Sequence, residues 1–392
     1  MERIGVRYFQ RLSEKYPHNF SPDEIHVLNP QERQELRRIQ RNNILRAGLA
    51  GAISAGLGVL AGVLLEKPML GPSPSDVPFD EQFGYLAAVM GISTLITLIE
   101  IAFLYLDALR SVHRLSVTAG LDLFPDNEGD AVIATVLVRA ALELPNPPDG
   151  KKGINPRREI SKVQLLIGTL VYKLKATATN FIVKALVRRV VGRAGFRTWM
   201  EVTAMPVFAF WNGLIAWWVM KQARIRAMGP SAVKEYTEVI FREMGEVGHR
   251  AREESFQAVG SAIVRSVDLH PNLISLIEAL EGRFGSPEEL VLDDSALFLE
   301  HLSELKANEQ EFVLRILAMA SIIDGKLKRR ERQLLREALA ICGFPPELDR
   351  INRWRKAFVK GDELPEYLIV NCLPERLTGP QPSPAQPRKR TI

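Results

Sequence analysis

The feature that most constrains this chain is a run of nineteen consecutive residues without a charged side chain, Ala47 to Leu65. As a helix this run would be about 28 Å long, close to the roughly 30 Å of a membrane's hydrocarbon layer. A second apolar run, Gln82 to Leu106, contains a single charge, Glu100. The connection between the runs is rich in proline and acidic residues. The two runs therefore predict a transmembrane helical hairpin over residues 42–107.

Basic residues gather at one end of this predicted hairpin. Five arginines closely precede the first run and two follow the second, whereas the connection holds only Lys67. Lys and Arg near the ends of a membrane helix favour the cytoplasmic side. We therefore expect a multi-pass inner-membrane protein with both termini in the cytoplasm, where residues 1–41 form N-terminal helices.

Small residues recur every four positions in the first run, at Ser54, Gly58 and Gly62. On a helix they would share one face, which a second copy of the chain can approach closely, so this face predicts a homo-oligomer. The other interpretation is that glycine is simply common in membrane helices. Glu100 is costly in a membrane, which makes it a candidate for an ion path or a partner of a basic side chain or headgroup.

A third uncharged run, Val202 to Met220, is also nineteen residues long. It contains three tryptophans, Pro206 and Asn212, and basic residues flank both ends. Tryptophan is typical of the membrane interface, and a buried amide requires a hydrogen-bond partner. We interpret this run as a re-entrant or surface-embedded helix, with Asn212 as a second candidate for a polar path. The alternative is a third span, which would place the C-terminal half outside the cell.

Residues 151–226 are strongly basic, with fifteen Lys or Arg against two acids, although the whole chain carries a net charge of only +5. Anionic headgroups of the cytoplasmic leaflet attract such a segment, and residues 180–196 mix basic and apolar side chains as an interfacial helix requires. No nucleic-acid-binding motif accompanies the charge, so lipid is favoured over nucleic acid. The region 108–235 is therefore predicted to be membrane-associated and helical. Its candidate anionic-lipid contacts are Lys184, Arg188, Arg189, Arg193 and Arg197.

The C-terminal half repeats its apolar residues every three or four positions, without an alternating strand pattern. The whole chain is therefore predicted to be all-α, with a cytosolic helical bundle after the membrane part. Residues 236–311 form its acidic first region, and residues 374–392 a disordered proline-rich tail. The sequence around His270 and Pro271 is interpreted as a helix boundary.

Residues 312–373 carry a pattern of their own, in which an apolar helix leads through an Asp-Gly pair to a Leu-rich helix. Gly325 can take the positive φ that ends a helix, and Glu331 falls in the first turn of the next helix. The positions that carry the pattern are Asp324, Gly325, Leu327, Glu331, Leu334 and Leu335. They resemble the tellurite-resistance TerB-like helical domain over about sixty residues.

This resemblance implies a small helical bundle linked to envelope or metal-stress systems and often fused to membrane or signalling modules. We therefore expect the C-terminal domain to bind a protein partner. The resemblance also makes Asp324 and Glu331 candidate metal ligands. The chain departs from the family pattern at Lys328, Arg329 and Arg330, where a small capping residue and acids are expected, so a structural role for the two carboxylates is favoured.

Motifs of known catalytic chemistry do not occur in the sequence. The six histidines lack metal-ligand spacing, and there is no H-E-x-x-H, G-x-S-x-G or phosphate-binding loop. Cys342 and Cys372 are interpreted as small apolar residues. We expect a non-catalytic, membrane-anchored scaffold or sensor without a cofactor, acting in an envelope or stress response. The alternatives are a transport or channel component that uses Glu100, and a membrane-attached enzyme with unrecognised residues.

Overall fold

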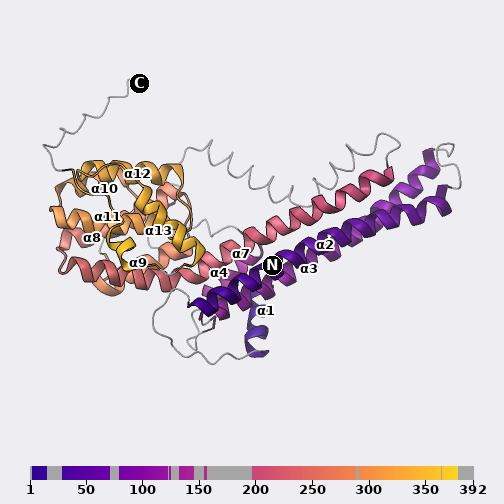
Figure 1. Ribbon diagram of the computed structural model, residues 1–392, viewed down its shortest axis with the longest axis horizontal. Coiled ribbons are helices and arrows are strands. Elements are labelled where there is room, and N and C mark those ends of the chain that lie inside the picture. The colour runs from indigo at the N-terminus through magenta and orange to yellow at the C-terminus, as the bar shows by residue number, and fades with distance from the viewer. Residues whose placement is uncertain are drawn as a thin grey trace, which may run out of the picture.

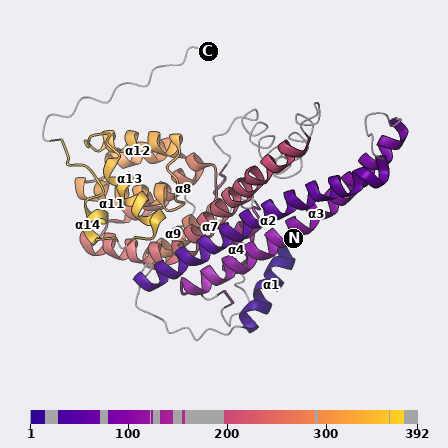
Figure 2. The same cartoon turned by 45° about the vertical axis from the view of Figure 1, so that its right-hand side comes forward.

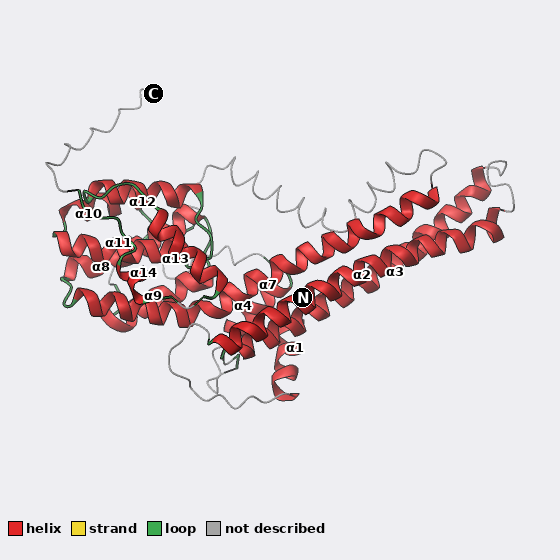
Figure 3. Cartoon of the chain, viewed as in Figure 1, coloured by secondary structure: helices red, strands yellow, loops and turns green. Residues whose placement is uncertain are grey.

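The computed structural model describes residues 2–15, 29–70, 79–121, 123–124, 132–144, 154–156, 197–287, 291–362 and 364–377. All regular secondary structure in these ranges is α-helical, without a strand (Figure 3), so the prediction of an all-α chain is confirmed there. Long helices form an elongated rod, and shorter helices form a bundle at one end of it (Figure 1).

Three helices build the rod: α2 (Pro30–Leu70), α3 (Phe79–Thr118) and α7 (Arg197–Met244). They lie side by side in both Figure 1 and Figure 2. α2 begins with a capping box, in which the Asn29 amide donates to Glu32 Oε2 and the Glu32 amide donates to Asn29 Oδ1, both at 2.8 Å. This reciprocal cap satisfies two amides that a helix start leaves without partners.

Two of these helices, α2 and α3, are the ones among the described residues that are long and apolar enough to cross a membrane. They contain the predicted runs Ala47 to Leu65 and Gln82 to Leu106. Only 17% of the apolar window in α2 and 12% of that in α3 is buried inside the protein. A core helix of a water-soluble protein would bury most of such a window.

The third apolar run, Val202 to Met220, does not double back. It is the first half of α7, which continues through Pro206 and Pro230 without a break. The interpretation of this run as a re-entrant segment is therefore wrong. The run packs along α2 instead, and the helix continues across Pro206 within it.

The direction of α7 also corrects the expectation that a third span would place the C-terminal half outside the cell. A Cβ on Gly48 would lie 3.3 Å from the carbonyl oxygen of Ala209, and one on Gly213 would lie 3.7 Å from Ile44. Residue numbers therefore rise along α7 as they fall along α2, and the two helices are antiparallel. The C-terminal half of α7 emerges at the end of the rod where α2 begins, so a crossing by α7 would not move the C-terminal half to the opposite side.

Two short helices, α1 (Glu2–Lys15) and α4 (Val132–Ala141), pack against the same end of the rod. The ring of Phe9 in α1 is fully buried and meets that of His113 in α3 edge to face, with centroids 5.4 Å apart. Ser13 Oγ lies 2.9 Å from His113 Nε2. A Cβ on Gly5 would overlap Val138 of α4, which explains why a glycine stands there.

The bundle packs against the C-terminal half of α7. Its helices are α8 (His249–Ser266), α9 (Pro271–Phe284), α10 (Ser295–Glu304), α11 (Ala307–Ile322), α12 (Arg329–Ile341), α13 (Asp349–Lys360) and α14 (Glu366–Val370). Tyr236 of α7 is buried and meets the ring of Trp354 in α13 edge to face, with centroids 5.3 Å apart. Because α7 belongs to this core, the boundary predicted between residues 235 and 236 falls inside a helix, as does that between 311 and 312 in α11.

Candidate functional site: a buried polar junction between three helices

The rod buries a cluster of polar side chains where α2, α3 and α7 meet. Ser54 Oγ of α2 donates a hydrogen bond of 2.5 Å to Glu100 Oε2 of α3. Asn212 Nδ2 of α7 donates one of 2.7 Å to Glu100 Oε1. Glu100 is 5% exposed and Asn212 2% exposed. Both carboxylate oxygens of Glu100 therefore accept a hydrogen bond from a different neighbouring helix.

Small residues on α2 allow α7 to come close enough for this contact. A Cβ on Gly51 would lie only 2.7 Å from Asn212 Nδ2 and from the carbonyl oxygen of Phe208. No side chain fits at that distance without movement of the α7 backbone. Gly51 therefore sets the separation at which Asn212 reaches Glu100.

A second polar cluster lies about two helical turns from Glu100, at the end of the apolar runs. Asp107 is buried and accepts a hydrogen bond of 2.7 Å from Asn43 Nδ2 and an ion-pair contact of 2.9 Å from Arg46 Nε. Arg46 Nη2 also donates to Ser111 Oγ at 3.1 Å. A charge-assisted network thus joins α2 to α3 at the end of the rod that faces the bundle.

Apolar side chains cover the outside of the same part of the rod. Many large ones are exposed on α2, α3 and the first half of α7. They include Leu45, Leu49, Ile53, Leu57, Leu60, Leu64, Leu95, Leu98, Ile99, Phe103, Val207, Phe210 and Leu214. The rod therefore buries its polar residues and exposes its apolar ones, the reverse of a water-soluble protein.

The small-residue face that is predicted to form a homo-oligomer contacts α3 of the same chain. Ser54 is bonded to Glu100, and the carbonyl oxygen of Gly62 accepts a hydrogen bond of 3.1 Å from the Tyr85 hydroxyl of α3. Gly58 lies between them on α2 and is half-buried. Self-association through these three residues stays a prediction.

The lower half of α7 makes a second set of specific contacts, with the bundle. Asn272 Nδ2 of α9 donates to the carbonyl oxygens of Ile225 in α7 at 3.0 Å and of Ile323 after α11 at 2.8 Å. Arg224 Nη2 donates to the carbonyl oxygen of Val359 in α13 at 2.6 Å. A Cβ on Gly325 would lie 2.5 Å from the Ile225 side chain. The Asp-Gly turn therefore packs directly on α7.

The two acidic residues of this turn cap the backbone around it. Asp324 Oδ1 accepts from the Lys326 amide at 2.7 Å, and Glu331 Oε2 accepts from the Lys328 amide at 2.6 Å. Gly325 has a φ of +78°, as the sequence predicts. Both carboxylates are buried, and burial, followed by the neighbouring charge of Asp324, raises the pKa of Glu331 to about 8.

Ligand geometry for a metal does not accompany these caps. The described part of the chain contains no group of three or more His, Cys, Asp or Glu residues placed to hold an ion. Lys326 and Lys328 both lie near Asp324 and act on its charge. The contacts of Asp324 and Glu331 are those of turn and helix caps.

The predicted lipid contacts fall almost wholly outside the described residues. Lys184, Arg188, Arg189 and Arg193 lie in the segment 157–196, which the structure does not describe. Arg197 is the first residue of α7. Contact of these residues with lipid stays a prediction.

Sequence reasoning missed one buried acid–imidazole pair in the bundle. Glu254 of α8 is 2% exposed, and its Oε1 lies 2.8 Å from His301 Nδ1 of α10. Burial raises the pKa of Glu254 to about 7. The pair is 47 positions apart in the sequence, so no local motif marks it.

The two cysteines are buried, and His270 caps a helix. Cys342 and Cys372 are buried and unpaired, and burial raises the pKa of each thiol to about 12, so neither supplies a thiolate at neutral pH. His270 caps α9, since its Nδ1 accepts from the Asn272 amide at 3.3 Å. The predicted helix boundary at Pro271 is confirmed.

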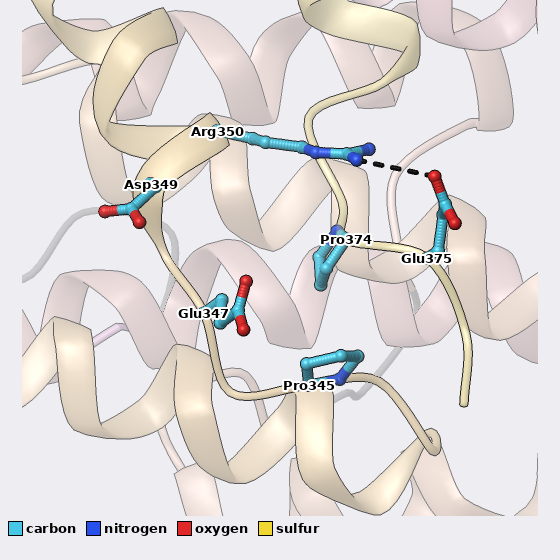
Figure 4. Close-up of a pocket in the computed structure, with 6 residues that line it drawn as sticks. All are labelled: Pro345, Glu347, Asp349, Arg350, Pro374 and Glu375. Carbon is cyan, nitrogen blue, oxygen red and sulfur yellow. Dashed lines mark ion pairs between the residues drawn. The ribbon is translucent and has the colours of Figure 1, made fainter.

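The bundle surface carries a shallow pocket of about 260 Å³ beside the start of α13. Figure 4 shows Arg350 reaching across it toward Glu375, to which it forms an ion pair of 3.7 Å. The lining residues are Pro345, Glu347, Asp349, Arg350, Pro374 and Glu375. Its charged lining therefore consists of three carboxylates and one guanidinium, joined by this ion pair.

Comparison with known proteins finds no match for this chain. It matches no protein-family profile, no curated protein and no solved structure. The TerB-like resemblance of the C-terminal part therefore stays a prediction from its residues.

Proposed function

We propose that this chain is a non-catalytic scaffold or sensor anchored in the inner membrane, in which α7 couples a membrane-embedded junction to a cytosolic helical bundle. The observation that carries the proposal is the inverted burial of the rod. Glu100, Asn212 and Ser54 are buried, while the large aliphatic side chains around them are exposed. In the bundle the pattern has the usual sense, with apolar side chains inside.

The exposed apolar surface of the rod favours a lipid environment. Fully exposing a large aliphatic side chain to water instead of burying it costs about 1.5–3 kcal/mol. The exposed apolar residues of α2, α3 and α7 together would cost on the order of tens of kcal/mol, more than a domain's usual net stability. Hydrocarbon removes that cost, and it also favours polar contacts between helices such as those of Glu100.

The two apolar runs of the hairpin support one common membrane layer. Ser54 lies seven residues from the start of its run at Ala47, and Glu100 lies six residues from the end of its run at Leu106. At 1.5 Å per residue both are about 10 Å from the same edge. The hydrogen bond between them therefore joins positions of equal depth, as two spans of one hairpin require.

The orientation follows from the charges at that edge. Arg46 and Asp107 form an ion pair just beyond the runs, and the other arginines of α2 and α3 lie on the same side. The positive-inside bias favours the cytoplasm for this end. Because α7 is antiparallel to α2, the bundle belongs on the cytoplasmic side with the start of α2.

Coupling through α7 is the part of the proposal that makes the protein a sensor. Asn212 and Ile225 are thirteen residues apart on one continuous helix, or about 20 Å. The first is bonded to the hairpin and the second packs on the Asp-Gly turn of the bundle. The proposed role in an envelope or stress response rests only on the TerB-like resemblance.

Alkaline carbonate extraction of membranes that contain the full-length chain tests the anchoring. We expect the protein to stay with the membrane in carbonate and in high salt. A cysteine placed at Ser73 should react from outside the cell with an impermeant maleimide. The native Cys342 and Cys372 give a quiet background because both are buried. Release of the intact chain by carbonate without detergent, or labelling of Ser73→Cys only from the cytoplasmic side, would contradict the proposal.

Transport through a path at Glu100 remains a separate hypothesis. Both oxygens of this carboxylate accept hydrogen bonds from neighbouring helices, which suits a helix–helix junction. Proton or ion flux into vesicles that carry the purified protein, lost in Glu100→Gln while the protein stays folded, would favour transport instead. Turnover of a lipid or peptide that one substitution abolishes would favour an enzyme.

A further inference from the structure

One face of α2 changes from basic to aliphatic at the end of the rod beside the bundle. A shallow groove of about 220 Å³ lies on this face and is lined by Arg37, Gln40, Arg41, Ile44 and Leu45. The positions fall three or four residues apart, so they form a single stripe on the helix. The groove therefore has a cationic end and an apolar end.

The cationic end presents two guanidinium groups one helical turn apart. Arg41 is exposed and makes no hydrogen bond or ion pair with the described residues. Arg37 has one distant ion-pair contact, 3.8 Å to Asp362, and the two side chains are 66% and 41% exposed. Such a pair contributes little, so Arg37 remains able to bind a stronger anion. The planar guanidinium group matches the geometry of phosphate oxygens, as it does that of carboxylates.

The apolar end continues up the membrane part of α2 in the same row. Four residues beyond Arg41 comes Leu45, then Leu49 and Ile53 at further steps of four, and these three are 54%, 60% and 59% exposed. Leu57 extends the row and is also exposed. From Leu45 to Leu57 the rise is about 18 Å, which matches the roughly 15 Å depth of one membrane leaflet.

From this row we infer that α2 carries a binding site for one anionic glycerophospholipid, with its phosphate between Arg37 and Arg41 and an acyl chain along Leu45, Leu49 and Ile53. The inference rests on the proposed membrane anchoring. The order of chemistry along the row is that of the lipid: anion-binding groups at the headgroup level, followed by aliphatic contacts through one leaflet. A free phosphate would use only the first part of it.

Lipid retention by the full-length protein in detergent tests the site. After delipidation, micelles are doped with phosphatidylglycerol or, in parallel, phosphatidylcholine, and bound lipid is counted by native mass spectrometry. We expect one phosphatidylglycerol to be retained in preference to phosphatidylcholine. Since each basic side chain contributes about fivefold near an anionic lipid, Arg37→Gln/Arg41→Gln should bind it about 20-fold more weakly.

The matched control removes the same charge at the same end of the rod. Arg11 of α1 and Arg114 of α3 are exposed and lie on other helices than the row, so Arg11→Gln/Arg114→Gln should change retention less than about twofold. Leu45→Gln keeps both arginines and should still weaken retention. Thermal unfolding of each variant shows that it folds. All of these changes are on exposed side chains.

Three results would overturn the site. Equal losses in both double variants would mean that only the general surface potential attracts lipid. Equal retention of phosphatidylcholine would remove the requirement for a net anionic lipid, and displacement of the lipid by millimolar glycerol phosphate would reduce it to a phosphate site. Carbonate extraction of the same proteins separates this failure from that of the proposed anchoring, because a chain that stays in the membrane yet shows no preference refutes only the lipid site.

Discussion

The contact of Asn212 with Glu100 offers the sharpest test of the proposed junction. Glu100→Leu removes the acceptor of the hydrogen bonds from Ser54 and Asn212, whereas Asn212→Ala removes one donor. In Glu100→Gln the side-chain carbonyl oxygen can still accept from Asn212. Its amide NH2 can donate to the Ser54 hydroxyl, which then acts as the acceptor. The three variants therefore differ in how many hydrogen bonds they leave between α3 and its neighbours.

The expected magnitudes follow from that count. Hydrogen bonds between membrane helices average about 0.6 kcal/mol, with a maximum near 1.7 kcal/mol. Glu100→Leu should lower the free energy of unfolding by about 1–3 kcal/mol and Asn212→Ala by about 0.6–1.7 kcal/mol. Glu100→Gln should cost less than about 1 kcal/mol. In the double variant of Glu100→Leu and Asn212→Ala, the two losses should overlap by about 0.6–1.7 kcal/mol, the coupling between the residues.

The assay is reversible unfolding of the purified protein in mixed micelles with increasing dodecyl sulfate, followed by circular dichroism. The four proteins of the cycle are measured under one condition. A coupling of zero would show that α7 and α3 are not joined by these residues and would refute the reasoning. A Glu100→Gln variant as unstable as Glu100→Leu would show that the negative charge, rather than the hydrogen-bond geometry, holds the junction.

Three further predictions concern other parts of the chain. Gly51→Ala should destabilise the rod by about 1–3 kcal/mol in the same micelle assay, because the added methyl group would lie 2.7 Å from the α7 backbone. Gly91→Ala is the control, since it has open space around it and should be neutral or stabilising. Phe9→Ala should cost about 3–5 kcal/mol of α1 docking and speed proteolysis there, while Ile4→Ala at an exposed position should not. Burial is the main reason that the pKa of Glu331 is raised from 4.5 to about 8 in the folded state. The folded protein therefore binds this proton more tightly than the unfolded chain does. The stability that Glu331 contributes through this proton falls as the pH rises from about 4.5 to 8. The melting temperature should therefore drop across this window, and Glu331→Gln, which can still accept from the Lys328 amide, should flatten the drop; an unchanged pH profile would contradict the raised pKa.

Local patterns in the sequence were sufficient for several elements of the fold. The left-handed Gly325 and the start of α9 after His270 depend on residues within a few positions of one another. The apolar runs of α2 and α3 also depend only on composition over one stretch. Such features can be predicted because their physical causes, backbone capping and solvation of a helix, are themselves local.

The partners of the candidate site could not be predicted in the same way. Glu100 is 46 residues from Ser54 and 112 from Asn212, and both are polar residues inside apolar runs with no pattern that joins them. The direction of α7 also escaped prediction, because basic residues flank its apolar run on both sides. Contacts such as Gly51 with Phe208 decide that direction, and they exist only once the helices are packed.

The unbroken helix α7 joins the rod to the bundle. Before Met220 it is bonded to a polar junction among exposed apolar surfaces, and after Met220 it is a buried element of the bundle. A loop between the two halves would absorb any movement of the hairpin. A helix does not, and Ile225 presses on Gly325 with no room for even a methyl group. Under the proposed function, a rotation or shift of α7 at Asn212 displaces the turn between α11 and α12, where Asn272 and Arg355 also donate to backbone carbonyl oxygens. This close contact is the one through which the proposed sensor would pass a change at the rod to the bundle.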